Sequence, residues 1–149
     1  MIFAEIIFIL AIFIIFWANI GYPISVLILG KIIKRRNKRK EGYYPSVTVM
    51  AVAHNEESVI KKKLDNLKTL KYPKENIEFL IASDNSTDKT NEIVENYIKN
   101  NPEMPLRIYK AQKRMGKTNA QNEAQKVVTT EFLVMTDANS IIDENAILE

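Results

Sequence analysis

The chain has 149 residues, enough for one membrane segment and about 105 residues of folded domain. Its net charge of +3 is unevenly distributed, because residues 31–40 carry seven Lys or Arg and no acid, whereas residues 41–149 carry 14 bases and 17 acids. This pattern argues against a nucleic-acid-binding domain, whose bases lie on the domain itself, and the absence of cysteine excludes disulfides and cysteine-ligated metals.

The first predicted element is a single transmembrane helix within residues 1–30. Residues 6–18 are thirteen consecutive apolar residues, and the apolar character continues to Leu29. A helix of 24 residues, from 6 to 29, is roughly 36 Å long and exceeds a hydrocarbon core of about 30 Å. Gly21 and Pro23 are tolerated in spanning helices. A signal peptide is the alternative, but the basic residues follow the apolar run and no A-x-A pattern comes after it.

Residues 31–45 are predicted to be a basic juxtamembrane collar and a short linker. Lys and Arg close to the end of a span stay in the cytoplasm, so the N-terminus should lie outside and the following domain in the cytosol. The chain is therefore expected in the cell membrane as a single-pass protein. The collar could also attract anionic headgroups of the lipid bilayer.

Residues 46–149 are predicted to alternate between strands and helices. The predicted strands cover 46–53, 77–83, 106–109 and 131–136. The predicted helices cover 55–71, where Asn55 is the cap and Lys61–Lys63 form a mostly solvated face, then 86–100 and 118–128. Such alternation indicates an α/β, Rossmann-like fold, a mostly parallel sheet with flanking helices.

Three polar clusters follow strands of the predicted sheet. They are HNEE at 54–57, DNSTD at 84–88 and DANS at 137–140. Ligands of parallel α/β sheets bind beyond the carboxyl ends of the strands, so all three clusters fall where a site is expected.

The second and third clusters contain candidates for base binding and for metal binding. Asp84 could accept the ring N–H of uracil or guanine, or it could belong to a simple turn. Asp137 and Asn139 offer two oxygen ligands suited to Mg²⁺ or Mn²⁺ against a diphosphate. The alternative for this pair is a polar turn that begins a helix at Asp143.

The first cluster has structural as well as functional interpretations. His54 is the one histidine of a cysteine-free chain, so a zinc site is improbable and His54 should line or pack beside the site. Helix capping explains Asn55 and Glu56, although Glu56 could also bind a ribose hydroxyl.

The segment AQKRMGKT, residues 111–118, fits a loosened phosphate-loop pattern. A true phosphate loop wraps the phosphates with backbone N–H groups, which glycines permit. Here one glycine is present where two are usual, and bulky side chains fill the loop. A single lysine, Lys117, that reaches towards a diphosphate is a weaker requirement, and the segment meets it.

Four segments together resemble family 2 glycosyltransferases, which have the GT-A fold and use nucleotide sugars. SVTVMAVAHNEE resembles the first strand and loop of that family, and IEFLIASDNSTDKT its second strand and D-[DN]-x-[ST]-x-[DG]-x-T element. KRMGKTNAQNEA resembles its R-x-G-K-x-x-A-x-N segment, and FLVMTDAN its D-x-D metal motif. The membrane helix directly before the domain resembles the arrangement in membrane enzymes that synthesise polysaccharides.

The resemblance implies a role for each matching residue. His54 and Glu56 would border the nucleoside, and Asp84, followed by Asn85, would take the uracil ring N–H of a UDP-sugar. The remaining implied contacts are Lys117 near the nucleotide and Asp137 with Asn139 at Mg²⁺ or Mn²⁺. Asn139 departs from the usual aspartate, so a weaker or water-mediated metal contact is expected.

The acceptor half that the resemblance implies is not in this sequence. The acidic general base is expected beyond residue 149, so the catalytic residues are unknown and the chain is predicted to be a donor-binding half, as a fragment or a truncated product. Its acceptor would be a carbohydrate or a lipid-linked molecule. Four strands could leave an exposed sheet edge. A phosphate-loop NTPase and a non-catalytic membrane-tethered binding module remain as alternatives.

Overall fold

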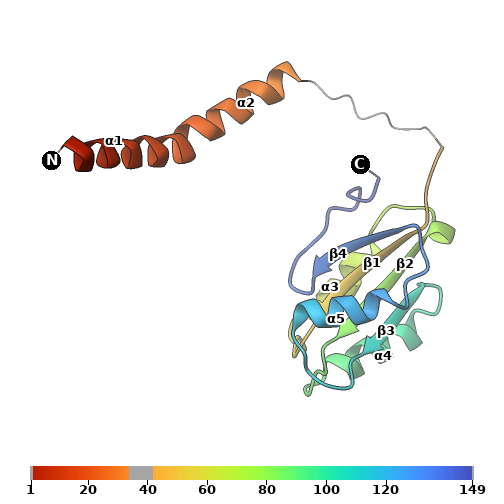
Figure 1. Ribbon diagram of the computed structural model, residues 1–149. Coiled ribbons are helices and arrows are strands. Elements are labelled where there is room, and N and C mark those ends of the chain that lie inside the picture. Colours follow the sequence, from red (N-terminus) through yellow and green to blue (C-terminus); the bar gives the residue numbers. More distant parts are fainter. Residues whose placement is uncertain (1, 34–41, 149) are drawn as a thin grey trace. The chain divides into compact units, whose positions relative to one another are not determined.

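The computed structural model describes residues 2–33 and 42–148, which belong to two compact units of residues 1–41 and 42–149 (Figure 1). The basic collar predicted from the sequence lies largely outside the described residues, and of its bases only Lys31 is described.

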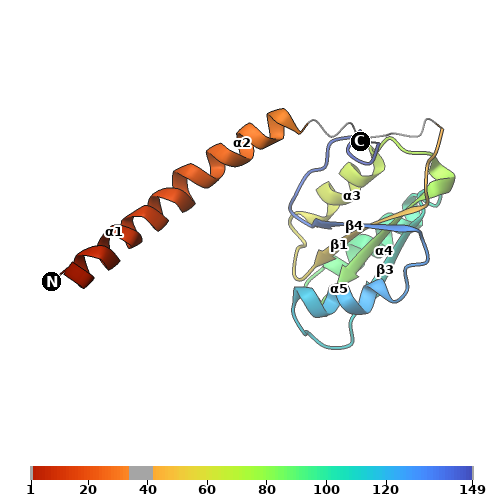
Figure 2. The ribbon, with the colours of Figure 1, turned by 45° about the horizontal axis from the view of Figure 1, so that its top comes forward.

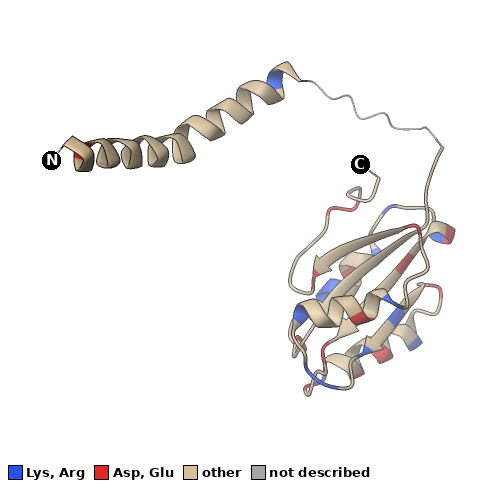
Figure 3. Cartoon of the chain, in the orientation of Figure 1, with Lys and Arg blue, Asp and Glu red and all other residues tan. Residues whose placement is uncertain are grey.

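The N-terminal unit is a single long helix. It consists of α1 (Ile2–Phe16), a π-helical turn η1 (Trp17–Gly21) and α2 (Tyr22–Ile32). The helix has 31 residues, none of them buried, and an 18-residue stretch of it has a mean hydropathy of 2.4. It carries almost no charge along its length (Figure 3). The long apolar helix predicted from the sequence is present, and it is long and apolar enough to cross a membrane. A signal sequence passes the same test, so that alternative stays open.

The π turn ends two residues before Pro23, which has no N–H to donate to the helix. A Cβ atom on Gly21 would lie 2.5 Å from the Trp17 ring, so the ring packs where only glycine leaves room. Ser25 Oγ donates to the Gly21 carbonyl at 2.8 Å, and Asn19 Nδ2 donates to the Ile15 carbonyl at 2.8 Å. These bonds satisfy polar groups that a membrane core would otherwise leave unpaired.

The second unit is built on a four-stranded parallel sheet in the order β3-β2-β1-β4. The strands and helices, in chain order, are β1 (Val47–Ala53), α3 (Ile60–Lys68), η2 (Lys74–Asn76), β2 (Ile77–Ser83), α4 (Thr90–Asn100), β3 (Leu106–Lys110), α5 (Lys117–Gln125) and β4 (Phe132–Asp137). The α/β class and the parallel sheet predicted from alternation are therefore confirmed.

Helices cover both faces of the sheet, as Figure 2 shows for α3 and α5. Alternate residues of β1 point to opposite faces because the side-chain period of a strand is two. Val49 and Ala51 pack with α3, α4 and β2, whereas Met50 and Val52 pack with Ala120 and Ala124 of α5. The small alanines allow α5 to lie close to the sheet.

All three helices of this unit differ from the predicted ranges. Helix α3 begins at Ile60 rather than near residue 55, because Asn55 adopts a left-handed φ of 54° and does not cap a helix. Helix α4 begins at Thr90, after a loop, and α5 ends at Gln125. Segment 138–148 contains turns and no helix at Asp143. Polar residues that resembled caps belong to loop–loop contacts instead.

Strand β4 is an edge of the sheet in the described part of the chain. Phe132 and Met135 on this strand are each 51% exposed. The exposed edge expected for a four-stranded sheet is present here.

Candidate functional site

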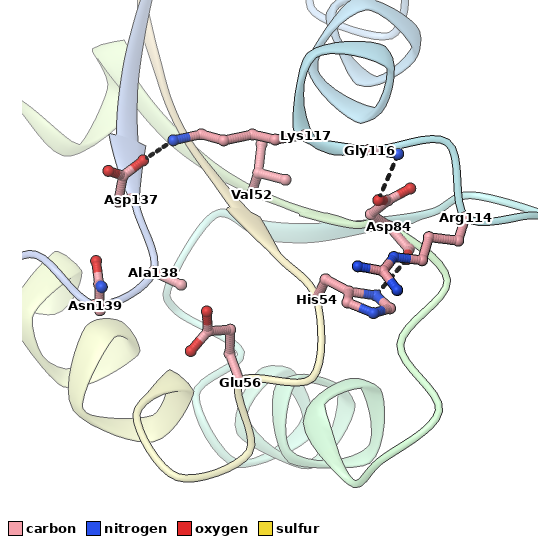
Figure 4. A pocket seen from close by; sticks show the side chains of 10 residues that line it. All are labelled: Val52, His54, Glu56, Asp84, Arg114, Gly116, Lys117, Asp137, Ala138 and Asn139. Atoms are coloured by element: carbon pink, nitrogen blue, oxygen red, sulfur yellow. Dashed lines mark hydrogen bonds and ion pairs between the residues drawn. The ribbon is translucent and has the colours of Figure 1, made fainter.

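A cleft opens at the carboxyl ends of β1, β2 and β4. The chain places β2 and β3 on one side of β1 and then β4 on the other, so the strand order reverses at β1, where α/β sheets form binding crevices. The cleft has a volume of about 320 Å³. Figure 4 shows its lining residues: Val52, His54, Glu56, Asp84, Arg114, Gly116, Lys117, Asp137, Ala138 and Asn139.

Asp84 lies at the end of β2 and is only 2% exposed. Its Oδ1 accepts the backbone N–H of Met115 and its Oδ2 that of Gly116, both at 2.9 Å. The side chain therefore fastens the loop before α5 to the sheet, a role beyond the simple turn considered from the sequence. Each carboxylate oxygen has a second lone pair, so the group can accept a further bond from a ligand.

These two bonds bear on the phosphate-loop interpretation of residues 111–118. A phosphate loop needs backbone N–H groups that point at phosphates. In this loop the N–H groups of Met115 and Gly116 point at Asp84, and Gly116 has the left-handed φ of 87° that such a turn requires. The structure gives that alternative no support.

His54 stands beside Asp84 in the cleft. Its Nδ1 lies 2.8 Å from the backbone carbonyl of Asp84, and a carbonyl can only accept, so Nδ1 carries the hydrogen. In the neutral ring, Nε2 is then the acceptor. The ring is thus oriented by the backbone and presents a defined edge to a ligand.

Bonds between side chains and backbone join the loop after β1 to the segment that leads into α4 and hold Glu56 in place. Thr87 N donates to Asn55 Oδ1, and Glu56 N donates to Thr90 Oγ1, each at 2.8 Å. Both Asn55 and Asn85 have left-handed φ values, 54° and 51°, which asparagine tolerates better than most residues. Glu56 lines the cleft, but Asn85, predicted to bind substrate, is not among its lining residues.

Lys117 and Asp137 face each other across the cleft and form an ion pair. Lys117 is the first residue of α5 and Asp137 the last of β4, and each side chain is 56% exposed. Exposed pairs contribute little to stability, so a ligand can separate this pair at small cost. Asn139 lies two residues beyond Asp137 on the same rim (Figure 4).

The oxygens of Asp137 and Asn139 fit a hard divalent cation. Mg²⁺ and Mn²⁺ accept one or two protein ligands and complete their shells with water and phosphate oxygens. Among residues 2–33 and 42–148, no group of three or more His, Asp or Glu side chains gathers into a closed metal site. The donor set therefore suits a cation that arrives with a phosphate-bearing ligand.

Sequence reasoning missed two basic residues. Arg114 lines the cleft, and the arginine of the R-x-G-K resemblance was its signal. Lys63, assigned to a solvated face, is fully buried and donates to Thr136 and Ser140, so that prediction was wrong. Its spacing of three and four residues from buried Ile60 and Leu67 on the core-facing side of α3 was the available signal.

Comparison with known proteins identifies the family. Residues 48–149 match the family model described as glycosyl transferase family 2. The chain belongs to this family. The match covers β1 to β4 almost completely and includes every residue of the cleft, so the resemblance in the four sequence segments is confirmed.

Two curated members of the family are similar to this chain over most of its length. The β-monoglucosyldiacylglycerol synthase of Nostoc sp. is 32% identical over 137 residues, which are 90% of this chain and 29% of that protein. The poly-β-1,6-N-acetyl-D-glucosamine synthase of Staphylococcus epidermidis is 28% identical over 115 residues, 77% of this chain and 26% of that protein. The chain thus spans less than a third of these relatives.

Solved glycosyltransferases share the fold, which is of the GT-A type. The mannosyltransferase PcManGT of Pyrobaculum calidifontis, in complex with GDP-Man and Mn²⁺, has a TM-score of 0.75 at 29% identity and covers 87% of this chain and 39% of its own. TarS of S. aureus in complex with UDP-GlcNAc has a TM-score of 0.63 at 26% identity, with 69% of this chain and 29% of its own covered.

Proposed function

We propose that this chain is the nucleotide-sugar-binding part of a membrane-anchored glycosyltransferase that serves the synthesis of a polysaccharide or glycolipid. Its donor is a UDP-sugar, held through Mg²⁺ or Mn²⁺. Family membership supports the reaction class, and the names of the Nostoc and Staphylococcus relatives support the class of product.

The observation that carries the proposal is the convergence of side chains from distant segments on one cleft. Six residues predicted from the polar clusters and the Gly-Lys segment line it: His54, Glu56, Asp84, Lys117, Asp137 and Asn139. A volume of about 320 Å³ suits part of a nucleotide sugar in an open crevice. We would not expect unrelated surface turns to bring together hydrogen-bond acceptors, the ammonium of Lys117 and the oxygens of Asp137 and Asn139 in one cleft.

Each side chain has a role in this proposal. Asp84, oriented by two loop amides, accepts the ring N–H of the base, while His54 and Glu56 border the nucleoside. Asp137 and Asn139 hold the cation, and Lys117 leaves Asp137 to bind the diphosphate. The cation, when bound, neutralises the charge of the leaving diphosphate. The amide oxygen of Asn139 carries less charge than a carboxylate and makes the weaker metal contact.

A GDP-sugar is the competing donor. Guanine also presents a ring N–H, so the carboxylate of Asp84 accepts either base, and the mannosyltransferase neighbour is in complex with GDP-Man. Adenine has no such ring N–H. A direct comparison of the two nucleotides decides between them.

The proposed location is the cell membrane, with the N-terminus outside and the catalytic domain in the cytosol. The helix Ile2–Ile32 can cross the bilayer, and the seven bases of residues 31–40 would stay on the cytosolic side. The partners are then a cytosolic nucleotide sugar, the bilayer, and a carbohydrate or lipid-linked acceptor.

Titration calorimetry on the full chain in lipid nanodiscs tests the proposal. We expect UDP-GlcNAc or GDP-Man to bind much more tightly with Mn²⁺ or Mg²⁺ than without, and Asp137→Ala to weaken the metal-dependent binding by about tenfold. ATP binding that is lost in Lys117→Ala would instead indicate an NTPase. A folded chain that binds none of these nucleotides would indicate a non-catalytic membrane-tethered module.

A further inference from the structure

Among residues 2–33 and 42–148, Lys63 is the largest fully buried side chain, with a relative exposure of 0%. A buried ammonium group is costly unless it pairs with a negative charge and each of its three N–H groups finds an acceptor. Lys63 Nζ donates to Thr136 Oγ1 at 2.9 Å, to the Ser140 carbonyl at 3.0 Å and to Ser140 Oγ at 3.4 Å. All three acceptors are neutral, and a residue kept in this costly state needs an explanation beyond packing.

The residues that accept hydrogen bonds from Lys63 lie directly before Asp137 and directly after Asn139 in the sequence. Thr136 directly precedes Asp137, and Ser140 directly follows Asn139. Thr136 Oγ1 lies 2.8 Å from Ser140 Oγ, and Ser140 Oγ donates to the Asp137 carbonyl at 2.9 Å. Since the hydroxyl hydrogen of Ser140 is thus committed, Thr136 donates to Ser140. The ammonium therefore begins a chain of hydrogen bonds that closes the turn after β4.

Helix α3 fastens the same segment at a second point. Asn66 Nδ2 donates to the Ile142 carbonyl at 2.8 Å, and Ile142 N donates to Asn66 Oδ1 at 2.9 Å. Lys63 and Asn66 lie on one side of the helix, three residues apart. The turn that carries Asp137 and Asn139 is thus bonded to α3 on one side. The side chains of Asp137 and Asn139 line the cleft on the other side.

The charge of Lys63 also interacts with that of Asp137. Burial lowers the pKa of Lys63 from its ordinary value, and the negative charge of Asp137 acts in the opposite direction. The two charges thus favour each other across the turn, although the ammonium bonds only to neutral oxygens. A methionine could fill the same volume, but it would leave the Ser140 carbonyl without this donor.

We propose that Lys63 is a positioning residue for the metal site: its buried ammonium fixes the turn Asp137–Ser140 so that the oxygens of Asp137 and Asn139 converge on one divalent cation. This rests on the proposed function, because it assumes that the cation binds at these residues. The side chain acts on the cation through the turn and touches neither the cation nor the nucleotide.

The test compares Lys63→Met with Lys62→Met, its exposed neighbour on α3, in the full chain in nanodiscs. Mn²⁺ binding is followed by electron paramagnetic resonance with UDP or GDP present, and nucleotide binding is measured separately without metal. We expect Lys63→Met to weaken Mn²⁺ by about tenfold and to broaden the signal of the bound ion, because supporting residues of metal sites have effects of this size. Metal-free nucleotide binding should stay within about twofold, and Lys62→Met should match the wild type.

Ser140→Ala supplies a second variant if Lys63→Met does not fold. It removes the hydroxyl but keeps the carbonyl acceptor, so a weakening of Mn²⁺ of about threefold is expected, with the same broadened signal. Wild-type Mn²⁺ affinity and an unchanged signal in the folded variants would overturn the inference and leave the proposed function intact. A wild-type chain that binds no Mn²⁺ with either nucleotide would overturn both.

Discussion

Lys117 places its ammonium group against the carboxylate of Asp137, which we propose binds the metal. The ammonium of Lys117 pairs with Oδ1 of Asp137. A metal ion that binds this oxygen would therefore compete with the lysine for it. The half-exposed pair is weak, and its separation leaves Lys117 beside the diphosphate that arrives with the metal. The two ligands should therefore respond in opposite directions to removal of this lysine.

Lys117→Met should tighten Mn²⁺ binding in the absence of nucleotide by up to about fivefold, because exposed ion pairs contribute up to about 1 kcal/mol. The same variant should weaken the nucleotide diphosphate by roughly tenfold, since a hydrogen bond to a charged group is lost. Calorimetry with each ligand alone measures both. Lys113→Met, exposed on the same loop and outside the cleft lining, is the control. Changes of the same sign for both ligands would exclude the competition.

Asp84→Asn should damage the site through the loop before α5. The asparagine NH₂ must face the N–H of Met115 or Gly116, which leaves a donor unsatisfied in a position only 2% exposed. The cost is about 1–3 kcal/mol, which lowers the melting temperature by several degrees. Nucleotide affinity should fall as well, while Mn²⁺ binding without nucleotide should change less.

Thermal unfolding followed by circular dichroism measures this loss, with Glu92→Gln, an exposed carboxylate on α4, as the matched control. If Asp84→Asn unfolds at the wild-type temperature, the two amide bonds do not hold the loop.

For single residues, the sequence predicted which side chains line the cleft but not which hydrogen bonds fix their positions. Asp84 and Asp137 were identified because strand ends are conspicuous in sequence. The partners of Asp84 are backbone amides 31 and 32 residues away, and no local pattern encodes them. Lys63 was predicted to face solvent because its charge was given more weight than its position on the helix. Ile60 and Leu64, which lie on the same side of the helix, are buried, and Lys63 is buried with them.

The strands were easier to predict than the starts of the helices. β1 and β2 fall within their predicted ranges because each is mostly apolar and almost entirely buried. Helix α3 begins several residues late because Asn55 binds Thr87 in the neighbouring loop rather than capping its own helix. A cap and a loop–loop contact use the same residue types, so tertiary structure decides between them.

The π turn of the long helix allows a prediction that depends only on packing. Trp17 is the only tryptophan of the chain, so its fluorescence reports on this turn alone. Gly21→Ala would place a Cβ 2.5 Å from the Trp17 ring and force the ring to move. A measurable shift of its emission maximum in nanodiscs is expected. Gly30→Ala, where nothing lies within 4 Å of the new Cβ, should leave the emission unchanged. Identical spectra for both variants would show that the ring does not pack on Gly21.

For the whole molecule, the distribution of charge predicts orientation in the membrane. The chain has no cysteine, so a single introduced cysteine is a clean label. A membrane-impermeant maleimide applied to intact cells should modify Ile2→Cys and should spare Glu92→Cys until the membrane is opened. The reverse pattern would contradict the proposed cytosolic location of the domain. Loss of the residue-2 label from the mature protein would indicate a cleaved signal sequence.

The central claim is that one divalent cation joins the diphosphate of a nucleotide sugar to Asp137. Electron–nuclear double resonance of Mn²⁺ bound to the full chain with UDP-GlcNAc or GDP-Man tests this most directly, because it detects ³¹P close to the ion. We predict strong ³¹P coupling in the wild type and loss of protein-bound Mn²⁺ in Asp137→Ala at the same concentrations. A bound ion without ³¹P coupling, or one that Asp137→Ala leaves unchanged, would contradict the account.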